Sequence, residues 1–224
     1  RGQEVEHEIV CMDGQVGAIG EQMREEGIPV HRVSRAPGFD RKLIGELRDL
    51  IRTRDVSIVH CHQYTPFLYG RLAAMGTDAK VVFTEHGRFY PDRYRYKAAL
   101  INPLLAILTP AVVAISSATR DALAKYEFMP KSKIQVIYNG IQPLKADPAR
   151  INELRSELGI PADSFVYGTV SRLDPVKNQI MMLESFAHCL KDYPESYLLM
   201  VGDGPERQRL EDQAESLGVS EKIL

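Results

Sequence analysis

Two basic side chains in the second half of the chain are placed where they could hold a phosphate group. Arg172 follows a β-branched run that ends at Val170, and Lys177 comes just before a segment of helical period. Backbone N–H groups and the helix dipole favour anions at a helix N-terminus, and a guanidinium and an ammonium there could bind a diphosphate. The structural alternative is that Arg172 pairs with Asp174 or Glu184 on the surface while Lys177 is simply solvated.

Three histidines come at the ends of two predicted strands in the first half of the chain. His86 ends a run that begins at Lys80, and His60 and His62 flank Cys61 at the end of an earlier run. An imidazole at a strand end can bind a substrate or move a proton near neutral pH, although such a histidine is more often structural. No carboxylate or second ligand set is spaced to complete a zinc site with them.

The segment 88–97, directly after His86, interleaves four cationic with four aromatic residues, among them Arg88 and Tyr90. Such a segment suits stacking on a sugar ring or contact with an anionic acceptor. It is equally compatible with a solvated loop whose aromatic rings lie against the sheet. A nucleic-acid-binding protein would use the same residue types, but that function leaves Arg172 and Lys177 unexplained.

Short β-branched runs alternate with helical segments along the first part of the chain, which predicts parallel strands joined by helices. Strands are expected at residues 5–11, 30–33, 57–61, 80–84, 111–115 and 134–137, with helices at 17–26, 41–54, 66–75, 94–108 and 118–126. The run 111–115 is apolar throughout and needs cover on both faces. We therefore expect a doubly wound, Rossmann-like α/β domain.

The pattern changes after Asn139-Gly140, where residues 141–149 contain Pro143 and Pro148 and show no strand period. A second α/β series follows, with helices at 151–158, 178–190 and 205–217 and strands at 165–170 and 197–201. The predicted domains are residues 1–143, whose first strand is expected to be missing, and 144–224. The second is expected to be incomplete, because two strands and an incipient third at 222–224 rarely form a self-sufficient parallel sheet.

Composition and charge narrow the class of protein. The 224 residues carry a net charge of −2, so no overall positive field draws the chain to nucleic acid or to an anionic membrane. The cysteines are odd in number and scattered, which argues against a disulfide framework or structural zinc and favours a reducing, cytoplasmic setting. The longest apolar stretch, 98–116, is interrupted by Asn102, Pro103 and Pro110 and is a poor membrane span.

Five stretches of the chain, in order, resemble glycosyltransferase family 4, whose retaining enzymes have the GT-B fold of two Rossmann-like domains. They are Thr-Glu-His-Gly at 84–87, Ala-Ile-Ser-Ser at 114–117, Ile-Tyr-Asn-Gly-Ile at 137–141, Gly-Thr-Val-Ser-Arg-Leu at 168–173 with Lys-Asn at 177–178, and Leu-Met-Val-Gly-Asp-Gly-Pro at 199–205. The resemblance runs over nearly the whole chain, which makes it more specific than any single motif.

The resemblance implies transfer of a sugar from a nucleotide diphosphate sugar to a carbohydrate or lipid-linked acceptor, with retention at the anomeric carbon. His86 occupies the position of a family histidine that touches the transferred sugar or its phosphate. The donor-binding residues that the resemblance implies are Ser171, Arg172, Lys177 and Gly204. Residues expected on the acceptor side are His62, Arg88 and Tyr90.

The same resemblance leads to expectations about cofactors and about family motifs that residues 1–224 do not contain. Fixed cations and helix-end amides stabilise a departing diphosphate without a metal, and no Asp-x-Asp motif is present, so no metal and no cofactor are expected. The family's glutamate-containing motif is expected beyond residue 224 and its Gly-rich first loop before residue 1, so this stretch alone should lack normal activity. Gln142 also replaces an acidic residue that is common after Asn-Gly-Ile.

Two alternatives belong to other classes of protein. The chain could be a noncatalytic nucleotide- or anion-binding module of the same fold. It could also be a peripheral binder of membranes or nucleic acid that works through residues 88–97; nucleic acid is not expected as a partner. The leading hypothesis places the enzyme in the cytoplasm, at the inner face of the membrane where its acceptor is lipid-linked.

Overall fold

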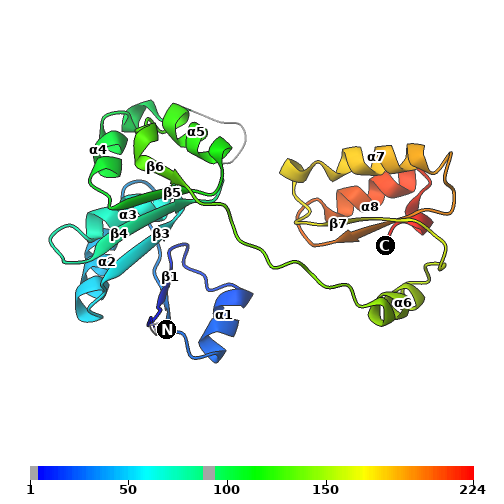
Figure 1. Cartoon of the computed structure of the whole chain (residues 1–224), viewed down its shortest axis with the longest axis horizontal. Coiled ribbons are helices and arrows are strands. Elements are labelled where there is room, and N and C mark those ends of the chain that lie inside the picture. Colours follow the sequence, from blue (N-terminus) through cyan, green and yellow to red (C-terminus); the bar gives the residue numbers. More distant parts are fainter. Residues whose placement is uncertain (1–4, 88–93) are drawn as a thin grey trace. The chain divides into compact units, whose positions relative to one another are not determined.

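The computed structural model describes residues 5–87 and 94–224. The chain divides into two compact units, Arg1–Gly140 and Ile141–Leu224, and each contains parallel strands that alternate with helices (Figure 1). The α/β class with parallel sheets, predicted from the sequence, is therefore confirmed.

The first unit contains six strands and five α-helices within its described residues. The strands are β1 (Ile9–Cys11), β2 (Val30–Arg32), β3 (Ile58–His62), β4 (Lys80–Glu85), β5 (Ala111–Ala114) and β6 (Ile134–Val136). The helices are α1 (Ala18–Glu25), α2 (Arg41–Thr53), α3 (Tyr64–Ala73), α4 (Ile101–Ile107) and α5 (Ser117–Tyr126). Strands β3 to β6 form one sheet in that order, whereas β1 and β2 form a separate pair.

The core of this unit lies between the β3–β6 sheet and its helices. Helix α2 buries Leu43, Leu47 and Ile51, whose spacing of four residues places them on one face. Phe67 of α3 stacks on Phe83 of β4 with ring centroids 4.3 Å apart. This packing fixes the strands whose carboxyl ends carry the histidines.

The helix predicted over residues 94–108 is interrupted in the structure. Tyr96–Ala98 form a 3₁₀ turn, η1, and the α-helix begins only at Ile101. Pro103 has no N–H to donate to the carbonyl group four residues earlier, so a continuous helix through Ala99 would lose a hydrogen bond. Proline is tolerated in the first turn of α4, where no such bond is required.

The second unit contains α6 (Pro148–Glu157), β7 (Val166–Val170), α7 (Gln179–Cys189), β8 (Tyr197–Val201) and α8 (Arg207–Ser216). Helices α7 and α8 lie together beside the strand pair (Figure 1), and the core joins Leu183, Phe186, Leu198 and Leu210. Ile223 forms a parallel bridge with Leu198.

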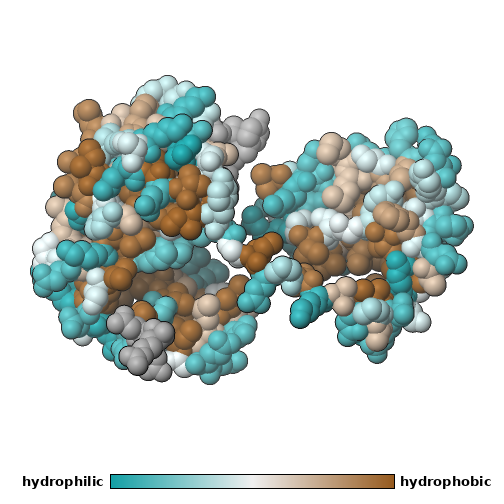
Figure 2. Space-filling model, viewed as in Figure 1, coloured by the Kyte–Doolittle hydropathy of each residue, from teal (hydrophilic) through white to brown (hydrophobic). Residues whose placement is uncertain are grey.

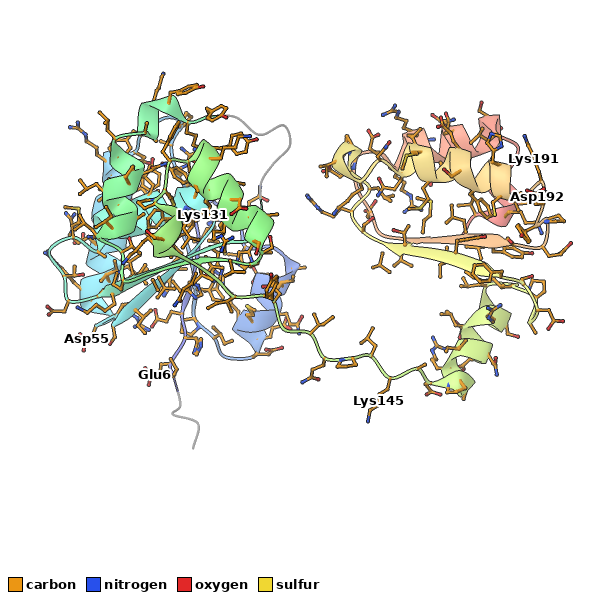
Figure 3. All side chains as sticks on the ribbon, turned by 45° about the horizontal axis from the view of Figure 1, so that its top comes forward. Glu6, Asp55, Lys131, Lys145, Lys191 and Asp192 are labelled. Carbon is orange, nitrogen blue, oxygen red and sulfur yellow. The ribbon has the colours of Figure 1, made fainter. Side chains whose placement is uncertain are left out.

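Helix α6 begins earlier than the sequence analysis expects. The Asp147 carboxylate accepts hydrogen bonds from the backbone N–H groups of Ala149 and Arg150, and Pro148 occupies the first helical turn. An aspartate cap followed by proline is a helix-start signal, so part of the predicted linker is helical. The residues before it lead out of β6 without helix or strand, and Lys145, labelled in Figure 3, belongs to that segment.

None of the helices in residues 5–87 and 94–224 combines the length and the apolarity that a membrane span requires.

Candidate functional site

The loop after β7 carries the two predicted phosphate-binding cations within one short turn. Arg172 lies two residues beyond the end of β7, and Lys177 ends the 3₁₀ turn η3 (Pro175–Lys177). The Asp174 carboxylate caps that turn by accepting a hydrogen bond from the N–H of Val176 at 3.1 Å. Asn178 then adopts a left-handed conformation, with φ 51°, which asparagine tolerates better than most residues, and α7 starts at the next position.

Both cations remain accessible to a ligand. The Arg172 side chain is 71% exposed, and its guanidinium lies 3.9 Å from the Asp174 carboxylate. The surface pair considered in the structural alternative is therefore present, but at this length and exposure it contributes little stability and leaves guanidinium donors available. Lys177 is exposed, and no carboxylate of the described residues forms an ion pair with it.

A buried glutamine, which sequence reasoning missed, holds this loop in place. Gln179 is 3% exposed, and its side-chain amide donates hydrogen bonds to the Ser171 hydroxyl at 3.1 Å and to the Arg172 carbonyl at 2.8 Å. It lies on the buried stripe of α7 with Leu183 and Phe186. A polar residue on such a stripe is the signal that could have revealed it, because a buried amide requires partners.

The two glycines of the Gly-Asp-Gly-Pro turn let this loop and the loop after β8 pack backbone to backbone. A Cβ atom on Gly202 would lie 1.9 Å from the Ser171 carbonyl oxygen, and one on Gly204 would lie 2.3 Å from that of Leu173. The Leu173 N–H also donates to the Asp203 carbonyl at 2.9 Å. The close approach is thus between two protein loops; contact of Gly204 with a donor stays a prediction.

The first unit brings three of its five histidines together at the carboxyl edge of the β3–β6 sheet. His62 ends β3 opposite Thr84, and His86 follows the end of the adjacent strand β4. Nδ1 of His62 lies 2.7 Å from Nε2 of His86, a hydrogen bond between the two rings. The His60 ring lies 4.1 Å from that of His62, centroid to centroid, and its Nε2 bonds the Thr84 hydroxyl at 2.9 Å.

The environment of His60 and His62 disfavours their charged forms. Partial burial lowers the pKa of His60, with a smaller contribution from His86. Partial burial also lowers the pKa of His62, and proximity to His60 and His86 lowers it further. Imidazolium ions this close would repel one another, so His60 and His62 favour their neutral forms.

A strained backbone position comes directly after β3, at Gln63. Gln63 has φ 72° and ψ 165°, a conformation that a residue other than glycine rarely adopts. Its N–H donates to the Thr84 carbonyl at 2.9 Å, and its own carbonyl accepts from Phe67 of α3. This turn redirects the chain just after His62, and it could not be predicted from the sequence because position 63 carries no glycine.

The cationic and aromatic segment has a partly structural role. Arg88 and Tyr90 lie outside the described residues. The Arg95 guanidinium pairs with the buried Glu127 carboxylate at 2.8 Å and lies 4.3 Å from the centre of the Tyr64 ring. The Tyr94 ring contacts the rings of Tyr96, Tyr126 and Phe128. These contacts attach the stretch just before α4 to the end of α5 and to Tyr64 of α3.

In the parts of the chain that the structure describes, no group of three or more His, Cys, Asp or Glu side chains is arranged to hold a metal ion. The expectation of a metal-independent reaction stays a prediction.

Comparison with known proteins gives matches along both units. A family model described as Glycosyltransferase Family 4 matches residues 1–143, and one described as Glycosyl transferases group 1 matches residues 150–224. The chain is 30% identical over 175 residues to the UDP-Gal:alpha-D-GlcNAc-diphosphoundecaprenol alpha-1,3-galactosyltransferase of Escherichia coli. It is 28% identical over 203 residues to the alpha-monoglucosyldiacylglycerol synthase of Streptococcus pneumoniae.

These alignments cover 74% and 84% of this chain but only 45% and 44% of the two relatives. The chain therefore spans slightly less than half the length of these curated relatives.

Two solved structures superpose on most of the chain. A glycosyltransferase from Rickettsia africae has a TM-score of 0.78 at 21% identity, covering 97% of this chain and 59% of that one. The Anabaena protein HepE, in complex with UDP and glucose, has a TM-score of 0.76 at 24% identity, covering 94% and 59%. At these identities the likeness shows the fold, which is the GT-B fold expected from the sequence.

Proposed function

Because the chain belongs to glycosyltransferase family 4, we propose that it forms part of an enzyme that transfers a sugar from a nucleotide diphosphate sugar to a carbohydrate or lipid-linked acceptor, with retention at the anomeric carbon. The observation that carries this proposal is the loop after β7, where Arg172 and Lys177 remain accessible while Gln179 fixes the backbone between them. The UDP and glucose named for the HepE complex support a nucleotide sugar as donor.

In this proposal, Arg172 and Lys177 bind the diphosphate of the donor. Cleavage of the bond between the sugar and the phosphate leaves negative charge on the departing nucleoside diphosphate. Two cations fixed in advance stabilise that charge without having to reorganise during the reaction. The Ser171 hydroxyl accepts a hydrogen bond from Gln179 and retains its own proton to donate to a phosphate oxygen. These groups could do this work without a metal, and we propose a metal-independent reaction.

His86 is proposed to contact the transferred sugar. It is exposed at the carboxyl edge of the sheet, where ligands bind in open α/β folds. Its ring already has one hydrogen bond, from Nε2 to His62, so Nδ1 is the nitrogen that would meet the substrate. A contact that strengthens as charge develops would raise turnover more than donor affinity.

Of the two acceptor classes we favour the lipid-linked one, and α4 offers a surface that would hold the enzyme at a membrane. The names of both relatives contain a lipid, a diphosphoundecaprenol in one and a diacylglycerol in the other. Leu100 is 90% exposed, and the exposed apolar side chains that continue along α4 are Ile101, Leu104 and Ile107. Apolar residues are visible at the surface in the region of α4 in Figure 2. An exposed apolar patch of this kind commonly marks an interaction site.

We propose that this contact occurs at the cytoplasmic face of the membrane. The three cysteines, Cys11, Cys61 and Cys189, are free thiols, which supports a reducing compartment.

The test is turnover by the full-length enzyme with UDP- and GDP-sugars and a polyprenyl diphosphate sugar or diacylglycerol acceptor. We expect a glycosylated product whose anomeric configuration, determined by NMR, matches that of the donor. Binding of a nucleotide sugar with no turnover on any acceptor would contradict the enzymatic proposal and favour a noncatalytic binding module. Turnover with inverted configuration would contradict the retaining mechanism alone.

A further inference from the structure

We infer that His62 is a positioning residue for His86, and that it acts by holding the His86 ring through the hydrogen bond between Nδ1 of His62 and Nε2 of His86. This inference rests on the proposed function, because it concerns the histidine assigned to sugar transfer. It gives His62 a different role from the acceptor contact expected from the sequence.

The pairing of β3 with β4 brings the two rings together, so the hydrogen bond between them follows from the backbone of the sheet. In the parallel pairing of β3 and β4, His62 lies opposite Thr84, and His86 comes two residues further along the second strand. Adjacent parallel strands thus bring both residues to one edge, where the nitrogens are 2.7 Å apart. The ring planes are inclined by 29°, with centroids 5.0 Å apart.

A hydrogen bond of this kind requires one proton between the two nitrogens. If both nitrogens carried protons they would repel, and if neither did, their lone pairs would face each other. The bond therefore ties the tautomer of His86 to that of His62. It also leaves Nδ1 of His86 as the ring nitrogen available to a ligand, in a fixed orientation and with a defined donor or acceptor role.

The surroundings of the His62 ring are themselves fixed. The His60 ring lies beside it, inclined by 36°, and is anchored through its Nε2 to the Thr84 hydroxyl. Directly after His62 the chain turns at the strained Gln63, whose N–H is bonded to the Thr84 carbonyl. Strain at such a position persists only where the surroundings hold it, and it is often found at functional sites.

The decisive comparison uses His62→Asn and His62→Gln in the full-length enzyme. The asparagine amide places a polar atom where Nδ1 of histidine lies, whereas the glutamine amide reaches the position of Nε2. We expect His62→Asn to retain turnover within about threefold of the parent. His62→Gln and His62→Ala should lose about 10- to 100-fold in kcat with little change in donor KM, since small misplacements of a reacting group have effects of this size.

A double-mutant cycle separates action through His86 from independent action. His86→Ala should lower turnover by itself, and adding His62→Ala to it should cause no further loss. An additional loss in the double variant would overturn the inference and indicate an independent contact of His62 with substrate. Equal losses in His62→Asn and His62→Gln, with unchanged unfolding temperatures, would also overturn it.

The same experiment distinguishes failure of this inference from failure of the proposed role of His86. If His86→Ala turned over at the parent rate, the assignment of His86 would be wrong, whatever the His62 variants did. If the His62→Ala protein did not fold, the asparagine and glutamine variants, which both keep a polar side chain, would still decide the question.

Discussion

The loop after β7 depends on single side chains that have different tasks. Arg172 and Lys177 supply charge, whereas Gln179 supplies a buried amide that fixes the loop's backbone. The first two could be proposed from the sequence because basic residues before a helix form a recognisable pattern. Gln179 was not, because its role depends on which carbonyl and hydroxyl the fold places beside it.

At the residue scale, Arg172→Ala and Lys177→Ala should each weaken binding of UDP or GDP about 10- to 100-fold. This corresponds to about 1.5–3 kcal/mol for one charge-assisted hydrogen bond. Isothermal titration calorimetry on the full-length enzyme would measure the change, and affinity for the nucleoside should remain the same. Lys191→Ala, at an exposed lysine labelled in Figure 3, is the matched control. Parent-like affinity in both site variants would show that the phosphate site is wrongly assigned.

From the lowered pKa values of His60 and His62 we also predict that the stability of the protein depends on pH. The pKa values of His60 and His62 are lowered in the folded protein from an ordinary value of 6.5. As the pH falls through that value, the unfolded chain therefore binds protons that the folded chain does not. The free energy of unfolding should decrease on acidification and recover as the pH rises again.

Urea unfolding of the full-length enzyme at several pH values between about 5 and 7.5 would measure this effect. In His62→Gln the decrease should be smaller than in the parent. His188→Gln, at an exposed histidine of the second unit, is the matched control for a histidine substitution outside the cluster. A larger decrease in His62→Gln would contradict the lowered pKa of His62.

At the element scale, the alternation of strands and helices was readable because each run has a clear period and a glycine or proline boundary. Strand β8 (Tyr197–Val201) was predicted with its observed bounds. The missed features depend on local chemistry or on pairing across the sheet. They include the break before Pro103, the Asp147 cap and the contact of His62 with His86, since strand register cannot be obtained from one strand alone.

A further prediction at this scale concerns helix α4, which carries apolar residues on both its buried and its exposed face. Leu105 and Ala106 are buried in the core, while Ile101 and Leu104 are more than half exposed. Replacing either exposed residue by glutamate should lower binding of the full-length enzyme to anionic phospholipid vesicles about tenfold, through the lost apolar burial.

Vesicle flotation would measure the bound fraction for Ile101→Glu and Leu104→Glu. Ile151→Glu is the control, because it places the same charge at a partly exposed apolar position of α6. Unchanged binding in both α4 variants, with normal unfolding temperatures, would show that α4 does not contact the membrane.

At the scale of the whole molecule, two units with separate cores are joined by residues without helix or strand. A protease should cut an exposed segment of this kind before it cuts either core. We expect limited trypsin digestion of the full-length enzyme to cleave after Lys145, and N-terminal sequencing should find a fragment that starts at Ala146. Lys145→Gln should lose that fragment and keep the other early cuts. Early cleavage inside α2 or α8 instead would contradict the division into two units.

The contact between the glycine turn and the loop after β7 has a consequence for how this region tolerates substitution. At most buried positions the damage from a mutation grows with the volume of the new side chain, because neighbouring atoms yield by degrees. At Gly202 and Gly204 the obstacle is a main-chain oxygen that would meet the first carbon of any side chain. Saturation mutagenesis should therefore find alanine nearly as harmful as leucine or tryptophan at these two positions. A graded profile would mean that the two loops can separate, and a flat one would show that their backbones remain in fixed contact.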